Sequence, residues 1–336
     1  MSFVPTAVIR DYGDTFAEAA ACRAACALFD YSFVARGRVA GASALGALGG
    51  LTARRLDDLP EGRIRYALRT DAAGHLAADL TVWRHPDGAF EVMSGRPSDI
   101  ADLARFAAPG AVEDLSAEGA IFAVQGPRAL AVLAAAGLDD PAIGRLGYYH
   151  FTVAAFDGAP LLVGRLGYTG EAGFELIVSR NDAAALWGRL AAHARPAGFA
   201  AADILRIEAG FVLFANEFRV PVTAAEAGLA GFHGAAAAAP APGVALVAFT
   251  ARAADRPVLW QPSPAVVLPA HRGEIAITSA CWSVAAGGVL GLGYVRREDR
   301  APGTPLVDPG GEFEGVQVAP RPFVDPDKRR PRALWS

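Results

Sequence analysis

Lysine is almost missing from this chain: of 31 lysine and arginine residues, only Lys328 is a lysine. The sequence therefore has no Gly-Lys-Ser/Thr loop of the kind that cradles nucleotide phosphates, and it has no Gly-x-Gly-x-x-Gly motif either. The formal net charge is only -4 at pH 7. A charge this small argues against a general nucleic-acid or membrane-surface binder.

Cysteine is scarce as well, with three residues in 336 and no Cys/His spacing that is typical of a zinc site. We expect a reduced, cytoplasmic protein without a metal centre. The start of the chain lacks a basic segment followed by an apolar stretch, so we expect no signal peptide. Two uncharged runs, 227–251 and 275–295, exceed the roughly 18 residues of a membrane helix. Repeated glycines interrupt both, and we interpret them as loops and short strands without a membrane span.

Helix-like and strand-like segments alternate through most of the chain, which is typical of an α+β fold. Residues 14–29 predict an amphipathic helix capped by Asp14 or Thr15, and residues 63–69 predict a strand. The Ala/Pro/Gly-rich stretch 234–243 predicts a linker. It separates residues 1–233, expected to form two interleaved α+β subdomains, from residues 244–336. Short strands between Gly and Pro there predict a small β-barrel or sandwich.

The segment Gly164–Glu175 contains the most informative pattern, a strand, a glycine-punctuated turn and a return strand. Glycine permits positive φ or a close backbone approach, which would explain Gly167, Gly170 and Gly173. The turn also holds a phenol and two carboxylates, Tyr168, Glu171 and Glu175. A buried carboxylate needs a partner, and a planar heterocycle with adjacent N–H donors would provide one. The alternative is a tight hairpin with polar side chains and no ligand.

The stretch Gly167–Glu175 resembles the signature of the aminomethyltransferase family, the T-protein of the glycine cleavage system. Further resemblances follow in the family's order: Cys26–Ser32 (family Gly-Leu-Phe-Asp-Val-Ser), Ala123–Pro127, Leu205–Gly210 and Phe214–Glu217. The resemblance implies a three-domain cloverleaf with a C-terminal β-barrel. It also implies tetrahydrofolate, or its methyl or methylene derivative, as the cofactor.

The resemblance assigns roles to several of these residues. Glu175 would hold the pterin ring, because a carboxylate that accepts paired N–H donors is a strong charge-assisted arrangement, and Tyr168 would line the same pocket. Glu171, from the same turn, and Arg206, from the Leu205–Gly210 helix, are further candidates for cofactor binding. Tyr66 lies on an alternating strand, where it either reaches the channel or packs in the core.

The sequence also departs from the family pattern. Where the family has Gly-Gly-x-x-Asp-Asp-Leu, residues 74–80 put Ala78 at the first aspartate and retain only Asp79. The resemblance makes that first aspartate the catalytic one. Because neighbouring strand residues point to opposite faces, Asp79 would replace it only through a register slip. His75 is a second candidate acid or base, or simply an exposed turn residue. Ala202 likewise replaces an arginine that meets the anionic side of folate.

These departures lead us to rank three hypotheses. The first is a divergent tetrahydrofolate-dependent one-carbon transferase or demethylase, which acts on a small-molecule donor and has a partner enzyme subunit as a candidate partner. The second is a folate-binding accessory or regulatory protein without this chemistry. The third is an ordinary glycine-cleavage aminomethyltransferase. It is placed last because Ala78 predicts a chain that is inactive in that reaction.

Overall fold

The computed structural model describes residues 8–234, 243–260, 266–333 and 335. They form two units, each assembled from separate pieces of the chain. The first unit falls within residues 1–69, 78–201 and 329–336, and the second within residues 70–77 and 202–328. Most of the predicted linker, 235–242, lies outside the described residues, so the domain limits drawn at 233 and 244 stay a prediction.

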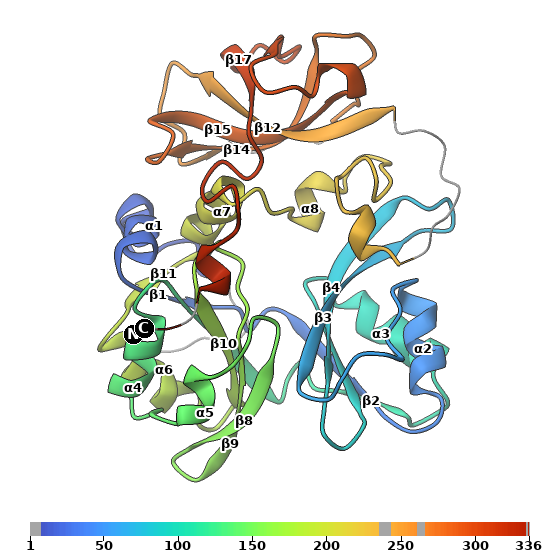
Figure 1. Cartoon of the computed structure of the whole chain (residues 1–336), viewed down its shortest axis with the longest axis vertical. Coiled ribbons are helices and arrows are strands. Elements are labelled where there is room, and N and C mark those ends of the chain that lie inside the picture. Colours follow the sequence, from blue (N-terminus) through green and yellow to red (C-terminus); the bar gives the residue numbers. More distant parts are fainter. Residues whose placement is uncertain (1–7, 235–242, 261–265, 334, 336) are drawn as a thin grey trace. The chain divides into compact units, whose positions relative to one another are not determined.

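A six-stranded sheet in the first unit has the strand order β11-β1-β7-β10-β9-β8 (Figure 1). The strands alternate, so Phe122 and Val124 point into an apolar core with Phe174 and Leu176. The helices α4, α5 and α6 cover that face of the sheet. Ala123 and Glu175 lie on the opposite face. The elements are β1 Ala27–Asp30, β7 Gly119–Gln125, β8 Phe151–Phe156, β9 Ala159–Gly164, β10 Gly173–Ser179, β11 Arg195–Ala197, α4 Ala129–Ala135, α5 Pro141–Gly144 and α6 Ala183–Ala191.

A five-stranded sheet, ordered β3-β4-β5-β2-β6, belongs to the first unit apart from Thr70 of β3 and Leu76 and Ala77 of β4, which are counted in the second. Leu80 and Val82 of β4 point into its core, against Leu48 of α2 and Leu103 of α3. The period of two sends Asp79 to the other face. The elements are β2 Ala35–Val39, β3 Arg63–Thr70, β4 Leu76–Arg84, β5 Phe90–Ser94, β6 Val112–Asp114, α2 Ala44–Leu51 and α3 Ser98–Phe106.

The second unit contains a six-stranded sheet ordered β13-β14-β15-β12-β17-β16, with an apolar core around Phe249 and Val289. Its described strands do not pair β13 with β16, so closure into a barrel stays a prediction. The elements are β12 Val244–Arg252, β13 Leu259–Trp260, β14 Ile275–Ser283, β15 Gly288–Arg296, β16 Pro305–Leu306, β17 Glu314–Ala319, α7 Phe199–Glu208 (which begins in the first unit), α8 Phe214–Glu217, and the short 3-10 helices Ala230–Phe232 and Arg297–Asp299; a third, Arg330–Arg332, follows in the first unit.

The predicted helix 14–29 is wrong in its second half. Helix α1 spans Thr15–Ala24 and begins as expected, because the carboxylate of Asp14 accepts a hydrogen bond from the backbone N–H of Ala17 at 3.0 Å. Residues 27–30 instead form β1, which pairs with both β7 and β11. Pairing on both sides overrides the local helical pattern. The uncharged run 275–295 forms β14 and β15, and the described residues include no helix long and apolar enough to cross a membrane.

Candidate active site

The signature turn is organised around Gln125, a fully buried amide at the end of β7. Its Nε2 donates to the carbonyl oxygens of Leu166 at 3.1 Å and Phe174 at 3.3 Å, one on each side of the turn. Its Oε1 accepts a hydrogen bond from the hydroxyl of Thr169 at 3.0 Å. A single side chain therefore fixes both arms and the middle of the turn.

The glycines of the signature follow from that arrangement. A Cβ atom at Gly167 would overlap the Gln125 amide, and one at Gly173 would lie 2.5 Å from Gln125 Nε2. Gly170 has a φ of 78°, which favours glycine. The expectation that geometry requires all three glycines is confirmed.

Glu171 is committed to ion pairs within the protein. Its carboxylate accepts hydrogen bonds from Nη1 of Arg23 at 2.9 Å and Nη1 of Arg330 at 2.5 Å, and its side chain is 4% exposed. The same C-terminal segment stacks Trp335 on Phe174 with ring centroids 5.2 Å apart. Glu171 and Phe174 thus fasten Arg330 and Trp335 to the signature turn. These ion pairs give Glu171 a structural role, and its assignment to cofactor binding stays a prediction.

Glu175 has a different environment, although it is only four residues away. It lies in a row of paired residues across the sheet: Phe29, Ala123, Glu175, Gly164 and Phe151. Its immediate neighbours are the two smallest members of that row. Among the described residues, no group forms a hydrogen bond or ion pair with its carboxylate. The side chain keeps some contact with solvent, yet enough protein surrounds it that burial raises the pKa of Glu175 to about 7.

Strand β4 approaches the same face of the sheet. A Cβ atom at Gly164 would overlap the ring of Trp83, and Trp83 also contacts Phe151 with ring centroids 5.0 Å apart. The indole nitrogen donates to the hydroxyl of Thr81 at 3.1 Å. Because side chains alternate along a strand, Asp79 shares the face of Thr81 and Trp83.

Asp79 is therefore on the site-facing side of β4, which contradicts our sequence interpretation. Its Oδ2 accepts a hydrogen bond from the hydroxyl of Tyr66 at 3.0 Å. Ala78 is completely buried and lies on the same face of β4 as the core residues Leu80 and Val82. A carboxylate at position 78 would enter an apolar core, whereas Asp79 reaches the other face without a register slip.

Tyr66 reaches this polar cluster rather than the core. Burial, the charge of Asp79 and the neighbouring Tyr149 raise the pKa of Tyr66 well above its usual range, and Tyr168 adds to the effect. The Tyr66 hydroxyl therefore remains a hydrogen-bond donor at physiological pH. The predicted residues Tyr66, Asp79, Tyr168 and Glu175 all lie in the first unit.

Sequence reasoning missed Tyr149. Its backbone has a φ of 61°, which is uncommon for a residue with a side chain and is often found at functional sites. Its N–H donates to the carbonyl of Arg165 and its carbonyl accepts from the N–H of Ile64, both at 2.9 Å. Burial raises the pKa of Tyr149, and Tyr148, Glu175 and Asp79 raise it further, so this phenol lies near both carboxylates. The aromatic pair Tyr148-Tyr149 before a strand was the available signal.

His75 and Arg206 belong to the second unit. His75 follows the turn before β4, is partly exposed, and has its Nδ1 3.6 Å from a carboxylate oxygen of Asp71. The guanidinium of Arg206 donates to Asp203 at 2.6 Å, Glu217 at 2.8 Å and Ser279 at 2.6 Å. It is completely buried. These contacts give Arg206 a structural role and place His75 beside a turn. The cofactor-binding role of Arg206 and the catalytic role of His75 stay predictions.

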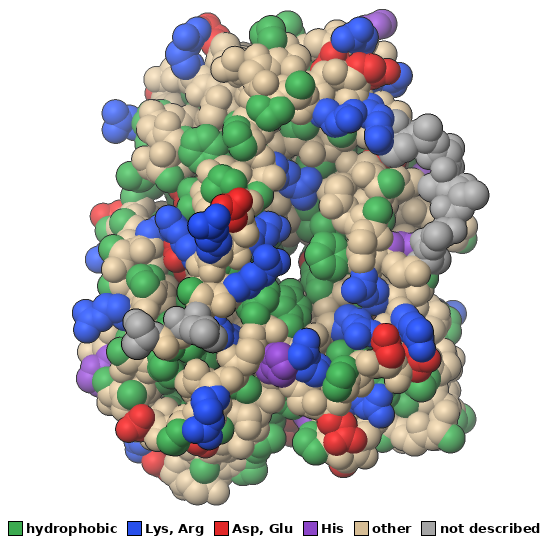
Figure 2. All heavy atoms as spheres, viewed as in Figure 1, with side chains coloured by type: hydrophobic (Ala, Val, Ile, Leu, Met, Phe, Trp, Pro, Cys, Tyr) green, Lys and Arg blue, Asp and Glu red, His purple; other side chains and the backbone are tan. Residues whose placement is uncertain are grey.

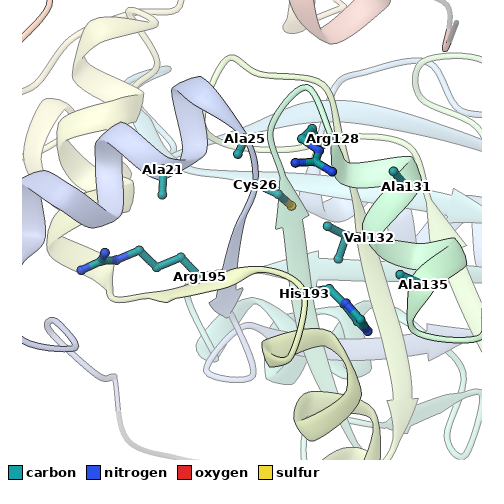
Figure 3. A pocket seen from close by; sticks show the side chains of 9 residues that line it. All are labelled: Ala21, Ala25, Cys26, Arg128, Ala131, Val132, Ala135, His193 and Arg195. Carbon is teal, nitrogen blue, oxygen red and sulfur yellow. The ribbon is translucent and has the colours of Figure 1, made fainter.

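Two other surface features carry no assigned chemistry. A cavity of about 290 Å³ is lined by Cys26, Arg128, His193 and Arg195, but Figure 3 shows Arg195 extending away from Arg128 and His193. The segment 328–332 is basic, and Figure 2 shows Lys and Arg side chains gathered in the middle of the face drawn. Within the described part of the chain, no cluster of His, Cys, Asp and Glu is suited to a metal ion.

Comparison with known proteins agrees with the geometry of the signature turn. Residues 10–235 match the family model described as GCVT N-terminal domain. An aminomethyltransferase of Saccharopolyspora erythraea is 31% identical over 342 residues, covering 94% of this chain and 91% of the relative. This chain belongs to the GCVT family. A Cutibacterium acnes aminomethyltransferase is 35% identical over 233 residues, and that match spans 65% of this chain and 63% of the relative, less than two thirds of its length.

The fold agrees with the GCVT assignment. Glycine cleavage system aminomethyltransferase T from Bartonella henselae matches with a TM-score of 0.79 and 26% identity, covering 95% of this chain and 92% of that structure. The family resemblance drawn from the sequence is therefore confirmed. Tetrahydrofolate is the cofactor that the GCVT family uses, and its folate-dependent one-carbon transfer is the coarse function of this chain.

Proposed function

We propose that this GCVT protein is a tetrahydrofolate-dependent aminomethyltransferase of the glycine-cleavage type. The observation that carries the proposal is the position of Asp79, which accepts a hydrogen bond from Tyr66 on the face of β4 whose Trp83 covers Gly164, the sheet neighbour of Glu175. Our ranking of the sequence hypotheses placed this function last because of Ala78. The buried position of Ala78 removes that objection, and the relatives named above are themselves aminomethyltransferases.

The residues present fit a reduced pterin. Glu175 is a largely desolvated carboxylate with no protein donor among the described residues. Its neighbour Ala123 presents only a methyl group on this face of the sheet, and the ring of Trp83 covers its other neighbour, Gly164. A carboxylate in this state favours a ligand that supplies paired N–H donors, as the amino-pyrimidine edge of a pterin does. Glu175 would hold and orient the ring. Tyr168 and Tyr149 would line the same site.

Asp79 would handle the proton. When bound, tetrahydrofolate supplies nitrogen nucleophiles that capture the transferred aminomethyl carbon, and a proton must leave the nitrogen that attacks. An ionised carboxylate within hydrogen-bond reach can accept it. The 3.0 Å hydrogen bond from Tyr66 holds the Asp79 carboxylate on this face of β4, where it would face the reacting nitrogen. A positioned base of this kind contributes roughly 10²–10⁴-fold to a rate.

The test is formation of methylenetetrahydrofolate and ammonia from an aminomethyl-loaded lipoyl carrier protein. We expect turnover by the unaltered chain and a loss of roughly 10²–10⁴-fold in kcat for Asp79→Asn. The matched control is Asp87→Asn, which changes a 59% exposed carboxylate that pairs with Arg38 in a turn. Turnover that starts only with methylated small-molecule donors would instead support the demethylase hypothesis. Folate binding without any turnover would support the accessory-protein hypothesis.

A further inference from the structure

Tyr31 carries a buried hydroxyl that no described residue satisfies. The residue is 6% exposed, and its hydroxyl oxygen has no hydrogen-bond partner. Phe29 stacks on the ring with centroids 5.8 Å apart and Phe33 meets its edge at 6.0 Å, so aromatic packing holds the Tyr31 side chain in place. Buried polar groups are normally paired, and an orphan in a native protein calls for an explanation. Tyr31 stands where the resembled family segment has valine, which has no hydroxyl.

The sheet places Tyr31 beside the candidate pterin site. Its N–H donates to the carbonyl of Ile121 at 2.8 Å, and Ile121 pairs with Ile177 of β10. Tyr31, Ile121 and Ile177 therefore form a row across the sheet, and on this face it is the next row to the one that contains Ala123 and Glu175. Because Tyr31 is two residues beyond Phe29, its side chain is on the same face of the sheet as Glu175. Ala123 separates the two and is small enough for an aromatic side chain to reach across diagonally.

Two polar groups on this face thus lack partners, and they have opposite characters. Glu175 offers acceptors, whereas Tyr31 offers a donor. Burial and the nearby charge of Glu175 raise the pKa of Tyr31 well above its usual range, so its O–H stays protonated. A ligand that forms hydrogen bonds with both the Glu175 carboxylate and the Tyr31 hydroxyl must present N–H donors next to an acceptor. The amino-pyrimidinone edge of a pterin has that pattern, because a carbonyl oxygen and a ring nitrogen flank its N–H donors.

We propose that Tyr31 is a specificity-determining residue of this site, whose hydroxyl donates a hydrogen bond to a ring acceptor of the heterocycle held by Glu175. The inference rests on the proposed function. Beyond that function, the chain would recognise the ring by two kinds of hydrogen bond, one from the ring donors to Glu175 and one from Tyr31 to a ring acceptor. The contact is with the ring itself, so it does not depend on the aminobenzoyl-glutamate tail.

The test uses calorimetric titration with tetrahydrofolate and with a tetrahydropterin that lacks the tail. Tyr31→Phe removes only the hydroxyl, and we expect it to weaken both ligands by roughly three- to tenfold. The ligand-free Tm should stay unchanged or rise, because the variant removes an unsatisfied buried group. The matched control is Tyr294→Phe, since the Tyr294 hydroxyl is also buried but donates to the carbonyl of Glu217 at 3.1 Å. That variant should lower the Tm and leave both affinities unchanged.

The outcomes separate the inference from the function on which it rests. Equal affinity of Tyr31→Phe and the unaltered chain for both ligands overturns the role of Tyr31 and leaves the proposed function intact. A fall in the ligand-free Tm as large as that of Tyr294→Phe means that the hydroxyl is satisfied within the protein, which also overturns it. No binding of either ligand by the unaltered chain overturns the proposed function itself, and the role of Tyr31 with it.

Discussion

Glu175→Gln should change stability and cofactor binding in opposite directions. Burial holds the pKa of Glu175 at about 7 in the folded chain, against 4.5 for an ordinary glutamate. The folded state therefore binds more protons than the unfolded state between these values, so the free energy of unfolding falls as pH rises through this window. Each pKa unit corresponds to about 1.4 kcal/mol. Because Glu175 keeps some solvent contact, we expect a penalty of about 1–3 kcal/mol, fully present above pH 7.

Glutamine keeps the shape of the side chain and cannot ionise, so the variant should escape this penalty. Its Tm should exceed that of the unaltered chain by a few degrees at pH 8 and match it near pH 4. Its affinity for tetrahydrofolate should fall by roughly 10- to 100-fold, the scale of a lost charge-assisted hydrogen bond. In the unaltered chain, affinity should decrease about tenfold from pH 8 to pH 6, because binding needs the carboxylate.

The measurements are thermal denaturation and calorimetric titration across this pH range, with the exposed Glu61→Gln as the control. The control should leave both quantities unchanged. Equal Tm values for Glu175→Gln and the unaltered chain at pH 8 would show that the Glu175 carboxylate is well solvated. Equal affinity in a folded variant would refute its role as the pterin anchor.

Three further substitutions test the packing around the site and in the second unit. Ala78→Asp should lower the free energy of unfolding by more than roughly 2 kcal/mol, because position 78 faces the core. The variant should not gain turnover, and a gain would mean that position 78 is the catalytic position. Gly167→Ala should cost about 1–3 kcal/mol because its methyl group overlaps Gln125, and an unchanged Tm would contradict the turn geometry. Glu217→Ala should cost about 3–5 kcal/mol, as it leaves the Arg206 guanidinium buried without that carboxylate. Urea denaturation measures each of the three.

The sequence predicted the signature turn well because its determinants are local. The glycines, Tyr168 and Glu175 fall within nine residues, and the spacing alone indicates a tight turn with polar groups. The strand at Ala27–Asp30 was missed for the opposite reason, because its partners are almost 100 and 170 residues away in β7 and β11. The hydrophobic pattern of residues 14–29 contains no information about those partners.

The error at Asp79 has a more specific cause. Strand periodicity correctly put Ala78 and Asp79 on opposite faces, but periodicity cannot say which face meets the core. The resemblance supplied that choice, and the structure reverses it through the buried neighbours Leu80 and Val82. Arg206 shows a similar limit, since an arginine inside a helix gives no sign that Glu217 and Ser279 will surround it.

The ion pair between Glu171 and Arg330 joins residues 159 positions apart, and this separation bears on synthesis at the ribosome. At typical elongation rates of about 5–20 residues per second, the signature turn leaves the ribosome roughly 8–30 s before the segment that fastens it. During that interval Arg23 is the only described partner of the Glu171 carboxylate, and the ring of Phe174 lacks its cover by Trp335. The nascent chain would therefore hold the cofactor turn in a loosened form until Arg330 and Trp335 have left the ribosome.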